Sequence, residues 1–154
     1  MNGRKLGLVA VLMVVLAAMA FPTLAAEKTV TVTLTESDIN SSYRVTNPRN
    51  RTITGVNVDL QAGQVVITAT YTTPKVSSIP VSVTLVPTLS NGHVTWTVSA
   101  ATANGKAASG ELLTQINAAI SASWRNYIKG KVTGKVTAFS ISDSSVTWTK
   151  TSTK

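Results

Sequence analysis

The sequence predicts an α+β fold in which a strongly twisted antiparallel sheet of six to seven strands wraps around one long amphipathic helix, with a short N-terminal helix in addition. Segments in which apolar residues alternate with threonine, serine or asparagine recur along the chain, separated by turn-forming residues. Segment 111–127 instead repeats its apolar residues every three or four positions, which is the period of a helix. The alternating segments therefore indicate a sheet with one wet face and one apolar face that needs a cover.

The first strand and the short helix follow from the start of this pattern. Apolar and threonine residues alternate through 29–35, which places the apolar side chains on one face. The alternation ends at Thr35, which has with Asp38 the spacing of a capping box, although Asp stands where Glu or Gln is usual. We therefore expect a helix of two or three turns from Glu36 that is ended by Asn47-Pro48.

Three pairs of alternating segments predict three antiparallel hairpins. The central turn contains Asn91-Gly92, which between two alternating segments is one of the strongest local signals of a hairpin. The predicted pairs are 53–60 with 65–71, 79–85 with 94–98, and 136–141 with 146–148.

The long helix is predicted to begin at Ser109-Gly110-Glu111, since serine is a good cap and an acid suits the first turn. It is expected to end at Gly130. A helix of this size is about 27 Å long and 10 Å across, whereas a sheet of six or seven strands is about 30 Å wide. Either the sheet curls closed on the helix, or the short helix shares the cover, or apolar surface remains for a ligand.

The N-terminal segment has the composition of a secretory signal. Arg4 and Lys5 precede an apolar run over 6–20, and small residues follow up to Ala26. We expect a signal peptide over 1–26, with an uncleaved anchor as the alternative, and a single sheet-plus-helix domain over 27–154. The expected location is secreted or in the extracytoplasmic cell envelope, reached by bacterial-type export. The chain has no cysteine, which excludes disulfides, thiol catalysis and cysteine metal sites.

The chain is basic, with a formal net charge of +8 from 14 basic and 6 acidic residues. This charge favours an anionic partner such as a membrane surface or a cell-wall polymer, although a solvated soluble surface explains it equally well. Nucleic acid is not expected, because aromatic residues are sparse and no binding motif is present.

Catalytic chemistry is not predicted. His93 is the only histidine and stands beside the Asn91-Gly92 turn, where a solvated side chain is the simpler interpretation. The few carboxylates form no pair with the spacing that acid–base catalysis or metal binding needs. We expect no enzyme activity, no catalytic residue, no cofactor and no metal.

The order of the segments resembles a known family. Thr33 to Asn40, the hairpin from Ile53 to Ile67, the Asn91-Gly92 and Asn104-Gly105 turns, and Glu111 to Asn117 are together similar to the LmeA-type and YpmS-like envelope proteins. The resemblance covers nearly all of 27–154. It implies a twisted sheet wrapped around a long helix, as in tubular lipid-binding modules, and an apolar ligand such as a phospholipid between helix and sheet.

We therefore expect an exported, non-catalytic binding protein that holds an apolar ligand, such as a lipid acyl chain, between helix and sheet. The alternative is a secreted structural or adhesive β module with a closed core and no small ligand; the oligomeric state is left open. The predicted ligand-binding residues are Val83, Trp96, Val98, Leu113, Ile116, Ile120, Trp124 and Phe139, and those for an anionic headgroup are Arg125, Lys129 and Lys131.

Overall fold

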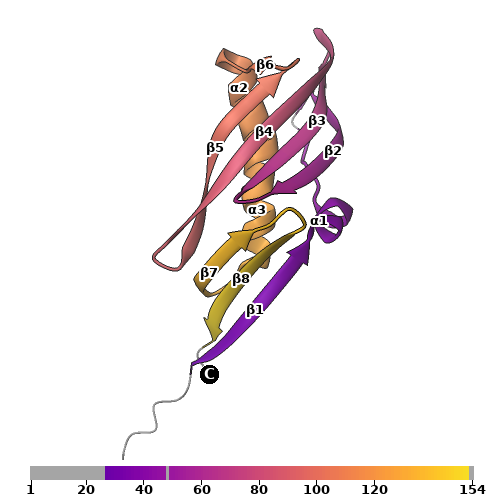
Figure 1. The fold of residues 1–154 in the computed structure, drawn as a ribbon. Coiled ribbons are helices and arrows are strands. Elements are labelled where there is room, and N and C mark those ends of the chain that lie inside the picture. Colours follow the sequence, from indigo (N-terminus) through magenta and orange to yellow (C-terminus); the bar gives the residue numbers. More distant parts are fainter. Residues whose placement is uncertain (1–26, 48, 153–154) are drawn as a thin grey trace, which may run out of the picture.

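The computed structural model describes residues 27–47 and 49–152, so the predicted signal peptide lies outside the described residues. The chain forms antiparallel strands and few helices, arranged as in Figure 1. The elements in order are β1 Lys28–Thr35, α1 Glu36–Ser42, β2 Thr52–Gln61, β3 Gln64–Thr73, β4 Val76–Ser90, β5 His93–Ala103, β6 Lys106–Ala107, α2 Gly110–Ile116, the π-helical turn η1 Asn117–Ser121, α3 Ala122–Lys131, β7 Lys135–Ile141 and β8 Ser145–Ser152.

The strands form two sheets, which corrects the prediction of one wrapped sheet of six to seven strands. One sheet has the order β2-β3-β4-β5-β6 and the other has the order β1-β8-β7. The three predicted hairpins are all present, but β1 pairs with the last strand, from Lys28 opposite Ser152 to Thr35 opposite Ser145. Alternation identifies hairpin neighbours, whereas nothing local in the sequence specifies the pairing of the first strand with the last.

Side chains from α1 explain why the two sheets do not merge at β2. The Asn40 amide accepts a hydrogen bond from the Val58 N–H and donates one to the Val58 carbonyl, both at 2.8 Å. A carboxylate oxygen of Glu36 accepts from the Leu60 N–H at 2.7 Å. Because these side chains occupy the outer edge of β2, another strand cannot pair there.

The capping box that was predicted for α1 is present. The Asp38 N–H donates to the Thr35 hydroxyl at 3.2 Å, and the Thr35 N–H donates to the Asp38 carboxylate at 3.3 Å. The helix ends at Ser42, however, several residues before Asn47-Pro48. Tyr43 ends it instead, because its extended backbone lets its ring enter the core, where it is 3% exposed.

The long helix runs continuously through α2, η1 and α3, from Gly110 to Lys131. It passes behind the five-stranded sheet, and its α3 end reaches the three-stranded sheet (Figure 1). Two details of the prediction are corrected: the Ser109 side chain makes no capping hydrogen bond, and the helix continues one residue past Gly130. No helix in the described ranges has the length and apolar character needed to cross a membrane.

The π-helical turn is tied to α1 by one buried hydrogen bond. An extra residue in a helical turn leaves a backbone carbonyl without its usual partner. The hydroxyl of Tyr43 donates to the Ile120 carbonyl at 3.0 Å, and burial raises the pKa of the Tyr43 phenol above its usual value. The short helix therefore shares the cover of the core with the long one, as one of the sequence alternatives anticipated.

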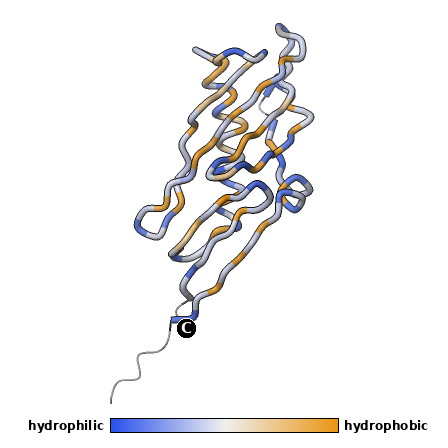
Figure 2. The backbone as a smooth tube through the Cα atoms, viewed as in Figure 1, coloured by the Kyte–Doolittle hydropathy of each residue, from blue (hydrophilic) through white to orange (hydrophobic). Residues whose placement is uncertain are grey.

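Both sheets and both helices contribute to a single hydrophobic core. Apolar and polar residues alternate along the strands, and the hairpin tips are hydrophilic (Figure 2). The largest fully buried side chains include Trp124, Tyr71 and Ile39, which come from the long helix, β3 and α1. Because one core spans the sheets, the helix and both sheets hold each other in place.

Candidate binding pocket at the end of the helix

Four of the predicted ligand-binding residues lie in the closed centre of the core. Val83, Ile116, Ile120 and Trp124 are each 0% exposed and pack against other buried side chains. Their surfaces are already covered, so a ligand could contact them only if the core opened. The middle of the helix–sheet interface is therefore filled by protein.

The remaining predicted residues lie nearer the surface. Val98, Leu113 and Phe139 are half-buried, whereas Trp96 is 8% exposed and lines a pocket. Of the three predicted headgroup residues, Arg125 and Lys129 line the same pocket. Lys131 does not; its ammonium lies 5.6 Å from the centre of the Tyr127 ring.

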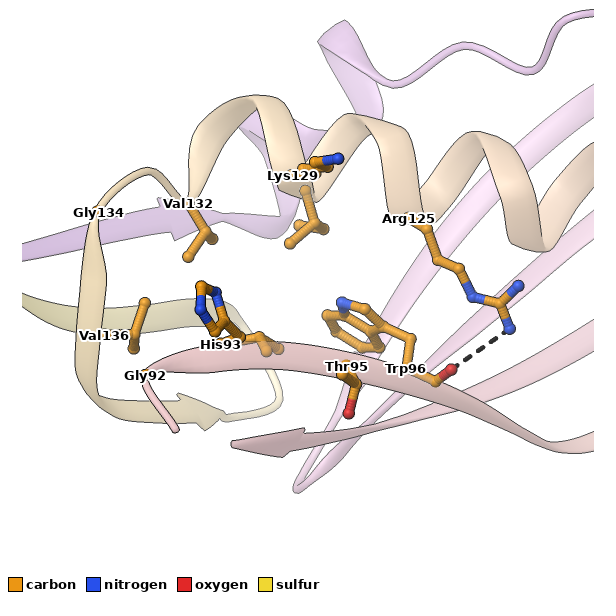
Figure 3. A pocket seen from close by; sticks show the side chains of 11 residues that line it. Gly92, His93, Thr95, Trp96, Arg125, Lys129, Val132, Gly134 and Val136 are labelled. Atoms are coloured by element: carbon orange, nitrogen blue, oxygen red, sulfur yellow. Dashed lines mark hydrogen bonds between the residues drawn. The ribbon is translucent and has the colours of Figure 1, made fainter. Parts of the chain in front are cut away.

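The pocket opens between the tip of the β4–β5 hairpin, the end of α3 and the start of β7 (Figure 3). Its volume is about 380 Å³, which lies at the lower end of the range for small-molecule sites. The hairpin tip, 92–96, is remote in sequence from the other two segments, which follow one another over 125–136. The lining residues are Gly92, His93, Val94, Thr95, Trp96, Arg125, Ile128, Lys129, Val132, Gly134 and Val136.

Local backbone geometry explains how the three segments meet. Asn91 and Gly92 both have positive φ angles, as a tight hairpin turn requires, and the Val136 N–H donates to the Gly92 carbonyl at 3.0 Å. Gly134 also has a positive φ, of 86°, where the chain reverses between α3 and β7. On α3, Arg125, Ile128 and Lys129 share one helix face because they are spaced by three and four residues.

The rear wall of the pocket is aromatic and well fixed. The Trp96 ring packs edge-to-face on Trp124 with centroids 5.3 Å apart, and on Phe139 with centroids 5.9 Å apart. The guanidinium of Arg125 donates to the Trp96 carbonyl at 3.3 Å, as the dashed line in Figure 3 shows. The indole nitrogen of Trp96 lies on the ring edge that faces the cavity (Figure 3).

The polar groups at this pocket are mainly hydrogen-bond donors. Arg125 and Lys129 are cationic, the Trp96 indole donates only, and none of the described lining residues is a carboxylate. Asp143, on the β7–β8 turn, lies outside the pocket and accepts from the Ala62 N–H at 2.9 Å. The remaining walls are apolar, so the pocket is chemically suited to an apolar ligand that carries an anionic or strongly accepting group.

Sequence reasoning missed part of this pocket. The sequence favours a solvated turn residue at His93; the side chain is exposed, yet it also lines the opening of the pocket. Ile128, Val132 and Val136 were not singled out as contacts. The available signals were the tight Asn91-Gly92 turn and the basic residues after residue 124, but nothing in the sequence shows that these segments adjoin.

A second pocket of about 530 Å³ lies at the opposite end of the long helix, near the turn between β3 and β4. Its lining is of mixed charge, with Arg51 and Lys75 together with Glu111. The Tyr71 hydroxyl donates to the Gln115 side chain, and the Gln115 amide donates to Glu111 at 2.5 Å. These three side chains bond to one another, and the pocket combines a carboxylate with two cations, so its lining does not favour one sign of charge in a ligand.

The described residues contain no group of three or more His, Cys, Asp or Glu side chains that could hold a metal ion. No family model matches the chain, and neither a curated protein nor a solved structure is significantly similar to it.

Proposed function

We propose that the protein is an exported, non-catalytic binding protein that holds an acyl chain, or a similar apolar ligand with an anionic head, in the pocket at the end of α3. The observation that supports this most is the combination of apolar walls with cationic and donor groups and no carboxylate among the described lining residues. Ile128, Val132 and Val136 offer apolar contact, while Arg125 and the Trp96 indole offer hydrogen bonds to an anion. A cationic or purely polar ligand would leave one of these two features unused.

The size of the pocket limits the ligand. A volume of about 380 Å³ accommodates one short chain, or the end of one chain of a larger lipid, rather than a whole phospholipid. Burial of a methylene contributes about 0.8 kcal/mol, so each additional buried methylene should tighten binding about fourfold. The head would lie near Arg125 and the chain would run toward Val132 and Val136.

The cellular location is also a proposal, which is supported by Arg4, Lys5 and the apolar run over 6–20. An exported protein meets anionic membrane lipids and cell-wall polymers, and the net charge of +8 favours contact with both. Cell fractionation and the intact mass of the purified chain would show whether the segment 1–26 is removed or retained as an anchor.

Calorimetric titration with three amphiphiles that share one alkyl chain tests the proposed chemistry. Decanoate, decanol and decyltrimethylammonium carry anionic, neutral and cationic heads on similar chains. We expect decanoate to bind best and the cationic amphiphile to bind least. Equal affinity for all three would contradict a role for the cationic side chains of Arg125 and Lys129.

Two variants locate the site. Arg125→Gln should weaken decanoate binding about tenfold, because it removes a charge-assisted hydrogen bond. Val132→Trp should fill the cavity and abolish binding of decanoate and decanol alike. Arg49→Gln is the matched control, since Arg49 is exposed and lies outside this pocket. An equal loss in Arg49→Gln and Arg125→Gln would show that only the general positive charge matters.

The closed centre of the core favours the alternative, a structural or adhesive β module. Ile116, Ile120 and Trp124 leave no continuous groove along the helix. Such a module would bind none of the three amphiphiles and would unfold cooperatively without any ligand effect. The same titration therefore distinguishes the two functions.

A further inference from the structure

The two sheets have exposed edges, and three of the four are obstructed. The outer edge of β2 is bonded by side chains from α1, as described for Asn40 and Glu36. The edge of β5 is covered at one end by β6 and is bonded by Arg125 at the Trp96 carbonyl. On β7, the Val136 N–H is bonded to Gly92 of the neighbouring hairpin.

The outer edge of β1 is different. The Glu36 N–H donates to the Ser144 carbonyl at 2.9 Å, and these two residues are the next pair after Thr35 opposite Ser145. This bond shows which residues of β1 direct their backbone groups toward β8. In an antiparallel ladder the backbone groups of successive residues point to opposite sides. The even-numbered residues of β1 therefore bond to β8, and the odd-numbered residues direct their N–H and C=O groups away from it.

The outward backbone groups belong to Thr29, Thr31, Thr33 and Thr35. The Thr35 N–H is occupied, since it donates to Asp38. For Thr29, Thr31 and Thr33, the described part of the chain supplies no hydrogen-bond partner for these groups. Residues 29–34 contain no proline and no charged side chain, and their pairing to β8 has no bulge, so the usual features that block an edge strand are absent from this segment.

We propose that this edge pairs with the same edge of a second copy of the chain, in antiparallel orientation about a two-fold axis at Thr31. Residues 29–33 read Thr-Val-Thr-Val-Thr, which is the same in both directions. An antiparallel copy therefore places Thr31 opposite Thr31 and Thr29 opposite Thr33. Each of these threonines would donate one backbone hydrogen bond and accept one. The pairing would use only the outward N–H and C=O groups that have no partner within the described part of a single chain.

The side chains support the same register. Threonine already faces threonine between β1 and β8, where the Thr31 and Thr149 hydroxyls lie 3.0 Å apart. The new pairing repeats this arrangement on one face. On the other face it places the half-buried Val30 opposite Val32 of the second copy, and Val32 opposite Val30. The three strands of each copy would form one continuous sheet across the axis. A partner of different sequence would lack this residue-for-residue match.

Sedimentation velocity of protein expressed from the full chain tests the proposal, with two cysteine variants and two charge variants. Thr31→Cys introduces the only cysteine, and a directly opposed pair about 5.5 Å apart between α-carbons can form a disulfide. We expect a dimer that becomes covalent on oxidation. Thr149→Cys is the matched control, because it lies on the same face but one strand inside the edge, and it should give no covalent dimer.

Opposed charges give a second test that does not depend on oxidation. Thr31→Lys should place like charges opposite each other across the axis and weaken self-association about tenfold. Thr31→Glu should do the same, and an equimolar mixture of the two should restore the dimer. A protein that stays monomeric at all concentrations would overturn the proposal. So would a dimer that Thr31→Lys leaves unchanged or that Thr149→Cys traps as readily as Thr31→Cys.

Discussion

The Asn40 side chain is predicted to stabilise the fold far more than its position in a two-turn helix suggests. Its amide bonds both backbone groups of Val58, a residue that is 1% exposed, with two contacts of 2.8 Å. Asn40→Ala removes both bonds and leaves the edge of β2 unpaired at that point. A typical intramolecular hydrogen bond contributes about 1 kcal/mol, and a buried group left unpaired adds to the loss, so we expect a cost of about 2 to 3 kcal/mol.

Urea and thermal denaturation, followed by tryptophan fluorescence and circular dichroism, measure this cost. For a domain of this size the expected loss lowers Tm by about 6 to 12 °C. Asn57→Ala is the control on β2, because Asn57 is exposed and its side chain makes no hydrogen bond within the described part of the chain. If Asn40→Ala cost no more than Asn57→Ala, the account of how α1 blocks the edge of β2 would be wrong.

The remaining predictions concern the π-helical turn, the hairpin tip and the first cap. Tyr43→Phe removes the buried hydrogen bond to the Ile120 carbonyl and should cost about 1 kcal/mol, whereas Tyr127→Phe removes only an exposed hydroxyl contact and should cost less in the same urea titration. Gly92→Ala should be more destabilising than Gly63→Ala, since both have positive φ but only at Gly92 would a β-carbon lie 2.7 Å from a lysine side chain; equal losses would contradict this. The Thr35 hydroxyl, and then the Thr35 N–H, lower the pKa of Asp38, so its contribution to stability is present above the ordinary aspartate pKa and is lost as pH falls through the lower folded pKa. An NMR titration that gave Asp38 an ordinary or raised pKa would contradict the capping geometry.

Much of the fold is predictable because it is encoded locally. The alternation of 29–35, the Thr35–Asp38 spacing and the Asn91-Gly92 turn each specify a strand, a cap or a hairpin within a few residues. The structure has all three, and the long helix lies where its apolar period predicts.

The division into two sheets was not predictable from such signals. It depends on the pairing of β1 with β8 and on Asn40 and Glu36 reaching β2, which are contacts between residues far apart in sequence. Within α1 alone, Glu36 is adequately explained as an acid in the first turn, and Asn40 as a surface group. Their use as substitutes for a neighbouring strand is visible only in three dimensions.

The candidate pocket was predictable only in part, for the same reason. Trp96, Arg125 and Lys129 were identified from a one-sided strand and a basic helix end, and the structure brings them together. Ile116, Ile120 and Trp124 satisfied the same helical period but occupy the closed centre of the core. Periodicity identifies the buried face of a helix without showing where along that face space remains.

The most direct test of the proposed function is native mass spectrometry of the protein expressed from the full chain, before and after incubation with decanoate. We predict a stoichiometric added mass, either a lipid that organic extraction recovers or decanoate itself, with a smaller bound fraction in Arg125→Gln and none in Val132→Trp. A bare polypeptide mass in both samples, from protein that is folded by circular dichroism, would contradict a ligand pocket at the end of α3 and would favour the structural module.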